Sequence, residues 1–141
     1  MSKEHGLDRI FVEERVIDIF RNLTAQATRR ASPIDQPFLE LKDVFLWAVA
    51  LGVKSGRRKP LEGSREGLFR WENLSNDFEI SCLQMIALAE NEDINVLSDL
   101  GEIQNIAEEY ANEGIRIIKK EILDEPGDPL LNLANIARSE K

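Results

Sequence analysis

Basic side chains gather in one short stretch of an otherwise acidic chain. The segment LGVKSGRRKPLEG, residues 51–63, holds four cations within six positions, although the 141-residue sequence has a formal net charge of -8. The guanidinium group of arginine suits phosphate and carboxylate groups, because its fixed fork of N–H donors matches their oxygens. With two arginines further along the chain, these cations predict a surface that contacts a partner or a phosphate: Lys54, Arg57, Arg58, Lys59, Arg65 and Arg70.

Three interpretations of this basic segment stay open. The cations could simply favour a helix C-terminus and keep a loop solvated. They could instead bind an acidic protein surface, including one on another copy of the chain, or they could bind the DNA backbone without reading its sequence. Residues 71–141 contain 5 Lys/Arg against 16 Asp/Glu, which disfavours wrapping by nucleic acid. We therefore expect a local contact and favour a protein as the partner.

Residue types that serve catalysis are scarce in this sequence. His5 is the only histidine, so a histidine-rich zinc site or a histidine-based triad is not expected. Cys82, the only cysteine, lies on an apolar helical face, and we expect a buried structural thiol because no histidine is near enough in sequence to activate it. The sequence predicts a protein that is not an enzyme and has no cofactor and no metal ligands.

One acidic segment nevertheless has the spacing of a calcium loop. In NEDINVLSDLGE, residues 91–102, five oxygen-bearing side chains match loop positions 1, 3, 5, 9 and 12. Val96 occupies the position where the sharp turn requires glycine, so we favour a connection in which Ser98 or Asp99 caps the next helix. A calcium-controlled switch or a cryptic enzyme is kept as the second alternative.

Apolar residues recur at helical spacing along most of the chain, and strand signals are scarce. The spacing predicts helices over residues 13–31, 38–53, 77–92 and 100–122, and a short last helix that begins at Pro129. The second helix is apolar nearly all round, which is typical of a central helix, and Gly56 is expected to end it. The acids of the long fourth helix are expected to form a solvated face with no pocket to shift their pKa: Glu102, Glu108, Glu109 and Glu113.

Residues 57–76 are expected to form a long connection, which Leu68, Phe69 and Trp71 attach to the core. The sequence thus predicts an all-α protein, a compact bundle of about five helices in one domain over residues 1–141, with a mobile tail at residues 1–8. A single cysteine and the lack of an apolar run of roughly 18 residues predict a cytoplasmic protein with no membrane contact.

Two segments of the chain resemble one known family. They are LKDVFLWAVALGVKSGRRKPLEG, and EEYANEGIRIIKKEI followed by PGDPLLNL. Both resemble the small accessory proteins encoded beside bacterial Dnd DNA-phosphorothioation systems, called Dnd-system-associated protein 4, and the resemblance covers most of residues 38–133. It implies a role beside enzymes that replace a phosphate oxygen of DNA with sulfur, or that restrict DNA lacking this mark. The expected partners are other Dnd-system proteins, and self-association through a second apolar patch is a further hypothesis.

Overall fold

The structure is a computed structural model that describes residues 9–24, 40–75, 77–124 and 129–138. Its α-helices are α2 (Ile17–Asn22), α3 (Leu41–Ser55), α4 (Glu79–Asn91), α5 (Leu100–Ile118) and α6 (Pro129–Arg138). Two antiparallel strands, β1 (Arg9–Glu13) and β2 (Arg65–Arg70), form a small sheet. Short helical turns lie between these elements: η1 (Glu14–Val16), η3 (Trp71–Asn73), η4 (Ile94–Ser98) and the π-helical η5 (Lys119–Leu123). Within this described part of the chain, no helix is long and apolar enough to cross a membrane.

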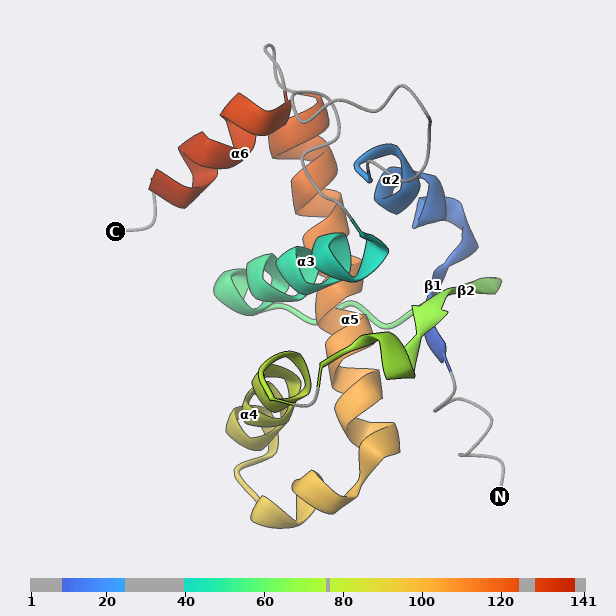
Figure 1. Ribbon diagram of the computed structural model, residues 1–141, viewed down its shortest axis with the longest axis vertical. Helices are drawn as coiled ribbons and strands as arrows, with labels where there is room; N and C mark the ends of the chain where they lie inside the picture. The colour runs from blue at the N-terminus through green and yellow to red at the C-terminus, as the bar shows by residue number, and fades with distance from the viewer. Residues whose placement is uncertain (1–8, 25–39, 76, 125–128, 139–141) are drawn as a thin grey trace.

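Helix α5 is the central element of the molecule. Figure 1 shows it running along the long axis, with α3 crossing it and the sheet on the other side from α4. Asp99 caps its first turn, because its Oδ1 accepts a hydrogen bond of 3.1 Å from the backbone N–H of Glu102. Its apolar side chains at helical spacing are buried, among them Ile103, Ile106 and Ile115. The predicted long helix is therefore confirmed, and of its two predicted caps, Ser98 and Asp99, the structure shows Asp99.

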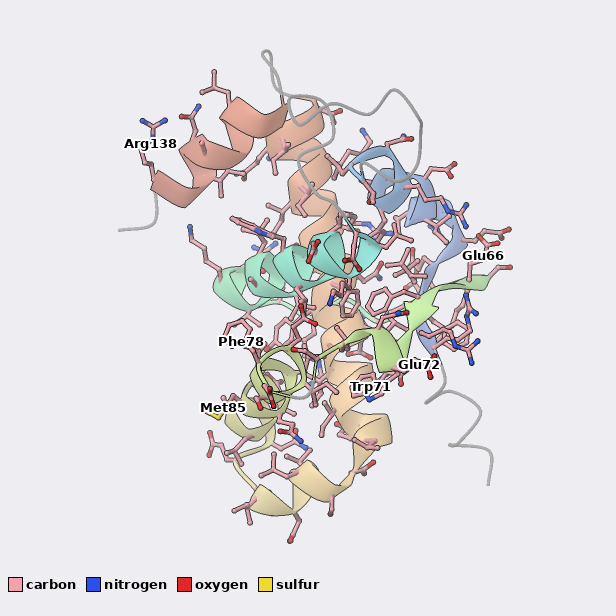
Figure 2. The ribbon with its side chains drawn as sticks, in the orientation of Figure 1. Glu66, Trp71, Glu72, Phe78, Met85 and Arg138 are labelled. Atoms are coloured by element: carbon pink, nitrogen blue, oxygen red, sulfur yellow. The ribbon has the colours of Figure 1, made fainter. Side chains whose placement is uncertain are left out.

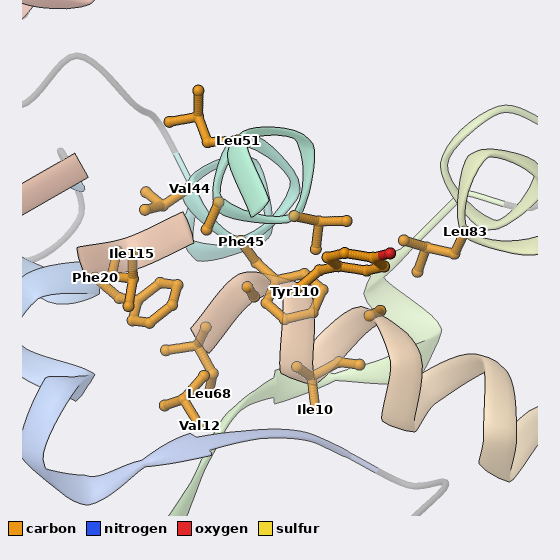
Figure 3. Packing of buried hydrophobic residues seen from close by; sticks show 14 of the residues in the cluster. Ile10, Val12, Phe20, Val44, Phe45, Leu51, Leu68, Leu83, Tyr110 and Ile115 are labelled. Carbon is orange, nitrogen blue, oxygen red and sulfur yellow. The ribbon is translucent and has the colours of Figure 1, made fainter. Parts of the chain in front are cut away.

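The core lies between α3, α5 and the sheet. Figure 3 shows buried side chains from all three elements converging, including Ile10 and Val12 of β1 and Phe45 of α3. The Phe45 ring packs edge-on against Phe69 of β2, with 5.5 Å between the ring centroids. As predicted, α3 ends at Gly56, which has a left-handed φ of 77°. The prediction that α3 is a central helix holds for one side only, because Ala50 and Val53 on its other side are exposed.

Two glycines allow the backbones of α3 and α5 to touch where the helices cross. A Cβ atom on Gly114 of α5 would overlap the carbonyl group of Ala48, and one on Gly52 of α3 would overlap that of Tyr110. Each helix thus contributes one glycine opposite a backbone segment of the other. The crossing distance is set by main-chain atoms, which cannot rotate out of the way as a side chain can.

The all-α prediction is wrong in one respect, because β1 and β2 form a sheet. The predicted first helix over residues 13–31 is helical only from Glu14 to Asn22 among its described residues, and it is preceded by β1. The predicted connection over 57–76 contains β2, although Leu68 and Phe69 are buried as expected and Trp71 packs partly against the core. The two strands are too short to show clear alternation in the sequence, and they are stabilised by partners distant along the chain. The expected mobile tail, residues 1–8, lies outside the described residues.

Helix α4 packs on the core through its buried residues Leu83 and Ala87. Cys82, which was predicted to be buried, is only half-buried, and Phe78 just before the helix is 71% exposed. The prediction of a buried thiol is therefore wrong, because α4 packs with the neighbouring stripe of its surface.

Replacing Gly114 by alanine should destabilise the fold. The new methyl group would overlap the backbone of Ala48, so the two helices must separate. Overpacking of this kind should lower the free energy of unfolding by about 2–3 kcal/mol, more than the better helix propensity of alanine offsets. Urea unfolding followed by circular dichroism measures the change.

The matched control is Gly56→Ala at the end of α3. Nothing lies within 4 Å of a Cβ atom at that position, so only the left-handed backbone opposes the substitution. Its expected cost is about 1 kcal/mol. Equal losses in the two variants would contradict a close helix crossing.

Candidate functional site

Four polar side chains form a row on α5, which we call the polar stripe: Gln104, Glu108, Asn112 and Arg116. Successive members are four residues apart, so they project from one helical face at intervals of about 6 Å. Two residues of an extended strand advance by about 6.7 Å. This near match lets the polar stripe follow β1 along the edge that β2 leaves unpaired.

The polar stripe supplies β1 with hydrogen bonds in place of a third strand. The Gln104 Nε2 donates to the backbone oxygen of Arg9 over 2.7 Å, and the backbone N–H of Phe11 donates to Glu108 Oε2 over 2.8 Å. The other two members donate to the carboxylate at the end of the strand. One carbonyl oxygen and one N–H group of an otherwise open strand edge are thereby satisfied by side chains of a helix.

That carboxylate belongs to Glu13, whose side chain is only 1% exposed. Its Oε1 accepts from Arg116 over 2.8 Å, and its Oε2 accepts from Asn112 over 2.9 Å and from the backbone N–H of Glu62 over 2.8 Å. Burial alone would raise the pKa of Glu13, but these hydrogen bonds outweigh it and lower the pKa to about 2. Glu13 therefore joins β1, α5 and the loop before β2.

Glu108 is the second buried carboxyl group of this region. Only 4% of its surface is exposed, and this desolvation raises its pKa to about 7 against the opposing effects of two hydrogen bonds and the charge of Arg65. The prediction that Glu108 belongs to a solvated face is wrong. Its place in the polar stripe explains why: it faces β1, while its neighbour Glu109 faces the loop and pairs with Arg58.

The described residues contain no group of three or more His, Cys, Asp or Glu side chains placed to hold a metal ion. In the calcium-like segment, Asp93 Oδ1 accepts from the backbone N–H of Asn95 over 3.0 Å, and Asp99 caps α5. Both acids thus stabilise helical turns. Glu13 and Glu108 likewise hold β1 in place through their hydrogen bonds. The contacts of these four acids therefore point to structural roles.

The six predicted contact residues are divided between the two ends of one loop. Figure 1 shows this loop crossing α5 from the end of α3 to the start of β2. Lys54 and Arg57 are exposed and Lys59 is half-buried at the α3 end, whereas Arg65 and Arg70 are exposed on β2. A contact of Lys54, Arg57 and Lys59 with a partner stays a prediction.

Arg58 is engaged inside the molecule. Its NH1 lies 3.0 Å from Glu90 Oε2 of α4, and its NH2 lies 2.9 Å from Glu109 Oε1 of α5. The guanidinium carbon also lies 6.0 Å from the centre of the Tyr110 ring, and the side chain is 24% exposed. Arg58 therefore ties the loop to two helices, and its removal would disturb the fold as well as any surface contact.

Three arginines lie on the face of the sheet opposite buried Ile10, and we call them the arginine face: half-buried Arg9 and the exposed Arg65 and Arg70. Cross-strand pairing places Arg9 directly opposite Arg70, whereas Arg65 lies opposite Glu13, whose buried side chain is bound by the loop before β2. A Cβ atom on Gly67 would overlap the Arg9 guanidinium group, so the absence of a side chain there lets Arg9 lie across β2. Arg9 was missed in the sequence because it precedes any recognisable pattern.

These observations define a mostly helical protein in which a two-stranded sheet displays arginines. The chain belongs to the family described as DNA sulphur modification system-associated protein 4, whose family model matches residues 16–141. The resemblance of the two sequence segments is thereby confirmed, and the protein is one associated with a DNA sulphur modification system. No match was found among curated proteins or among solved structures.

Glu13→Gln should destabilise the protein strongly. The neutral amide keeps the size of the side chain but leaves the Arg116 charge without its carboxylate, and it puts an N–H group where acceptors are needed. Breaking such a pair should lower the free energy of unfolding by about 3 kcal/mol. Urea unfolding at pH 7 measures this, and Glu14→Gln at the exposed neighbouring position should change stability by less than about 0.5 kcal/mol. Similar effects of the two substitutions would contradict the role of Glu13.

Glu108 should make stability fall as pH rises from 5 to 8. Its pKa is raised from the usual 4.5 to about 7, so the folded protein binds this proton more tightly than the unfolded chain does. The stability that protonated Glu108 contributes is lost as pH rises through 7, and the full change is about 3 kcal/mol. Urea unfolding at several pH values measures the decrease.

Glu108→Gln, which carries no charge at any pH, should remove most of this decrease. Glu113→Gln on the same helix should keep it and serves as the control. A decrease of equal size in wild type and Glu108→Gln would contradict the assignment.

Proposed function

We propose that the protein is a non-enzymatic accessory protein of a DNA sulphur modification system, and that it binds an acidic surface on another protein of that system through the arginine face. The observation that carries this proposal is the direct pairing of Arg9 with Arg70 across the sheet. The first residue lies on β1 and the second on β2, so the fold itself brings the two cations together.

Like charges that face each other on neighbouring strands destabilise a sheet. The chain has 26 acidic residues, yet among the described residues Arg70 forms its ion pair with the exposed Glu72, whose carboxylate oxygen lies 3.5 Å from the Arg70 Nε. An exposed ion pair at this distance contributes little. Carboxylates of a partner would relieve the repulsion, and two or three guanidinium forks would orient them.

The buried titratable groups support a role without catalysis. Glu13 and Glu108 face the backbone and side chains of their own molecule, and both hold β1 in place. A catalytic acid or base needs to reach a substrate proton. The family name, which describes an associated protein, agrees with this proposal.

The test is binding of the double variant Arg65→Ala/Arg70→Ala to each purified protein of the system, measured by biolayer interferometry. Loss of two charged contacts should weaken binding by about tenfold or more, because charge-assisted hydrogen bonds across an interface are removed. Arg21→Ala/Lys120→Ala removes two exposed cations elsewhere and should leave binding unchanged. The thermal stability of the control should match that of wild type, and that of Arg65→Ala/Arg70→Ala should be no lower, because removal of Arg70 relieves its repulsion with Arg9.

A second measurement separates protein from DNA as the target. Binding to a short DNA duplex, with and without phosphorothioate, is measured between 50 and 200 mM salt, where phosphate contacts weaken steeply. Steep salt-dependent DNA binding that the arginine variant loses would replace the proposed partner with the DNA backbone. Unchanged binding of the variant to every protein of the system would overturn the proposal.

A further inference from the structure

Strand β1 lies between the polar stripe of α5 and strand β2. Along one edge its backbone is hydrogen-bonded to Gln104 and Glu108, and along the other edge it pairs with β2. Neighbouring strands are about 4.8 Å apart, so only the width of β1 separates the Glu108 carboxyl group from β2. A buried titratable group thus lies close to the arginine face.

The hydrogen bonds of Glu108 connect it to the backbone that carries the arginine face. Its Oε2 accepts from the backbone N–H of Phe11 and from Gln104 Nε2, each over 2.8 Å. The same Nε2 donates to the backbone oxygen of Arg9 over 2.7 Å. Phe11 lies opposite Gly67, the residue across which the Arg9 side chain extends. Glu108 therefore contacts the part of β1 that positions Arg9.

Charged groups on three elements surround Glu108. Burial is the main cause of its raised pKa, which the positive charge of Arg65 on β2 lowers and the negative charge of Glu109 on α5 raises. Glu109 is itself held in an ion pair with the loop before β2. From β1, the ionised Glu13 is held in an ion pair with α5, and Arg9 extends across β2. Arg65 is exposed, so a partner can reach its charge.

The acids of the β2 region differ in their position relative to the arginine face. Figure 2 shows Glu66 and Glu72 toward opposite ends of β2. Glu72 forms its exposed ion pair with Arg70. Glu66 follows Arg65 directly and pairs across the sheet with buried Val12, so the two side chains leave opposite faces of the strand. The Arg65 charge can therefore act both on Glu108 and on a partner.

We propose that an acidic partner on the arginine face competes with Glu108 for the charge of Arg65, so that binding is accompanied by the uptake of a proton from solvent on Glu108. This inference rests on the proposed function, because it concerns the same surface. Carboxylates brought to Arg65 cancel its attraction for the Glu108 carboxylate and add repulsion. By reciprocity, protein in which Glu108 is already protonated binds the acidic partner more tightly.

The affinity for an acidic ligand should therefore fall as pH rises. In the free protein the pKa of Glu108 is about 7, and in the complex it is higher. Glu108 is protonated in both states below these values and charged in both states above them, and binding takes up the proton between them. The affinity should decrease by about threefold to tenfold between pH 6 and pH 8.5, where the carboxylates of the ligand stay ionised.

The first test follows the side-chain carboxyl carbon of Glu108 by NMR during a pH titration of the full-length protein labelled with ¹³C-glutamate. The signal is assigned by correlation with its own backbone. Arg65→Ala should raise the pKa of Glu108, because the attraction for its carboxylate is lost. Arg21→Ala, which removes an exposed cation on α2, should leave this pKa unchanged. An excess of an unlabelled peptide of about ten glutamates should raise the pKa in wild type.

The second test measures the affinity of the same peptide, carrying a fluorescent label, by anisotropy at several pH values. Glu108→Gln is neutral at every pH, so its affinity should stay constant where that of wild type decreases. His5 is the only histidine of the chain and also titrates in this range. His5→Gln is therefore the matched control and should keep the wild-type decrease.

A pKa of Glu108 that neither Arg65→Ala nor the peptide changes would overturn the proposal, and so would an equal decrease of affinity in wild type and Glu108→Gln. The titration of Arg65→Ala gives a decision even where Glu108→Gln does not fold. The two proposals can fail separately. If a protein of the system binds the arginine face with no effect on Glu108, only the coupling is lost. If no protein of the system binds there, the coupling between Arg65 and Glu108 is still measured by the NMR titration.

Discussion

Main-chain contact between α3 and α5 at Gly52 and Gly114 sets the geometry from which the other surfaces follow. With the two backbones in contact, the end of α3 lies beside the middle of α5, and the loop after Gly56 must cross α5 to reach β2. Arg58 then forms an ion pair with Glu109, and the backbone N–H of Lys59 donates a hydrogen bond of 3.1 Å to the Glu109 carbonyl oxygen. The same placement of α3 leaves Leu46, Ala50 and Val53 beside α4. A crossing fixed by main-chain atoms thus positions the loop that leads to the arginine face.

In a two-stranded sheet, one edge of each strand has no neighbouring strand to hydrogen-bond with. The polar stripe provides hydrogen-bonding partners for that edge of β1. Here a helix replaces the missing strand, and its polar side chains are buried as a consequence. The pKa values of the two buried carboxyl groups, Glu13 and Glu108, shift in opposite directions. Glu13 has a charged partner and several N–H donors, so it stays ionised to low pH, whereas Glu108 has donors but no adjacent cation in contact and holds its proton to about pH 7. Similar residues in one network therefore differ in charge near neutral pH.

Features that depend on local sequence could be predicted, and those that depend on distant partners could not. The extent of α5, its cap at Asp99 and the end of α3 at Gly56 follow from spacing and from the conformational preference of single residues. β1 could not be predicted, because its hydrogen bonds come from residues far along the chain. The i,i+4 series from Gln104 to Arg116 was a readable signal, since polar residues at that spacing inside an apolar helix need partners. The basic segment was recognised, but sequence proximity could not show that one arginine is internal and the others lie on different sides of α5.

The position of β1 in the chain has a consequence for how the protein is made. This strand is synthesised first, yet its partners lie at residues 65–70 and at 104–116, so the hydrogen bond from Phe11 to Glu108 closes over 97 residues. A growing polypeptide folds from its N-terminus as it leaves the ribosome, and contacts of high sequence separation form late. β1 can therefore complete its hydrogen bonds only after almost the whole of α5 has emerged from the ribosome. Completion of the sheet, and with it the arrangement of Arg9 and Arg70, thus follows the synthesis of α5.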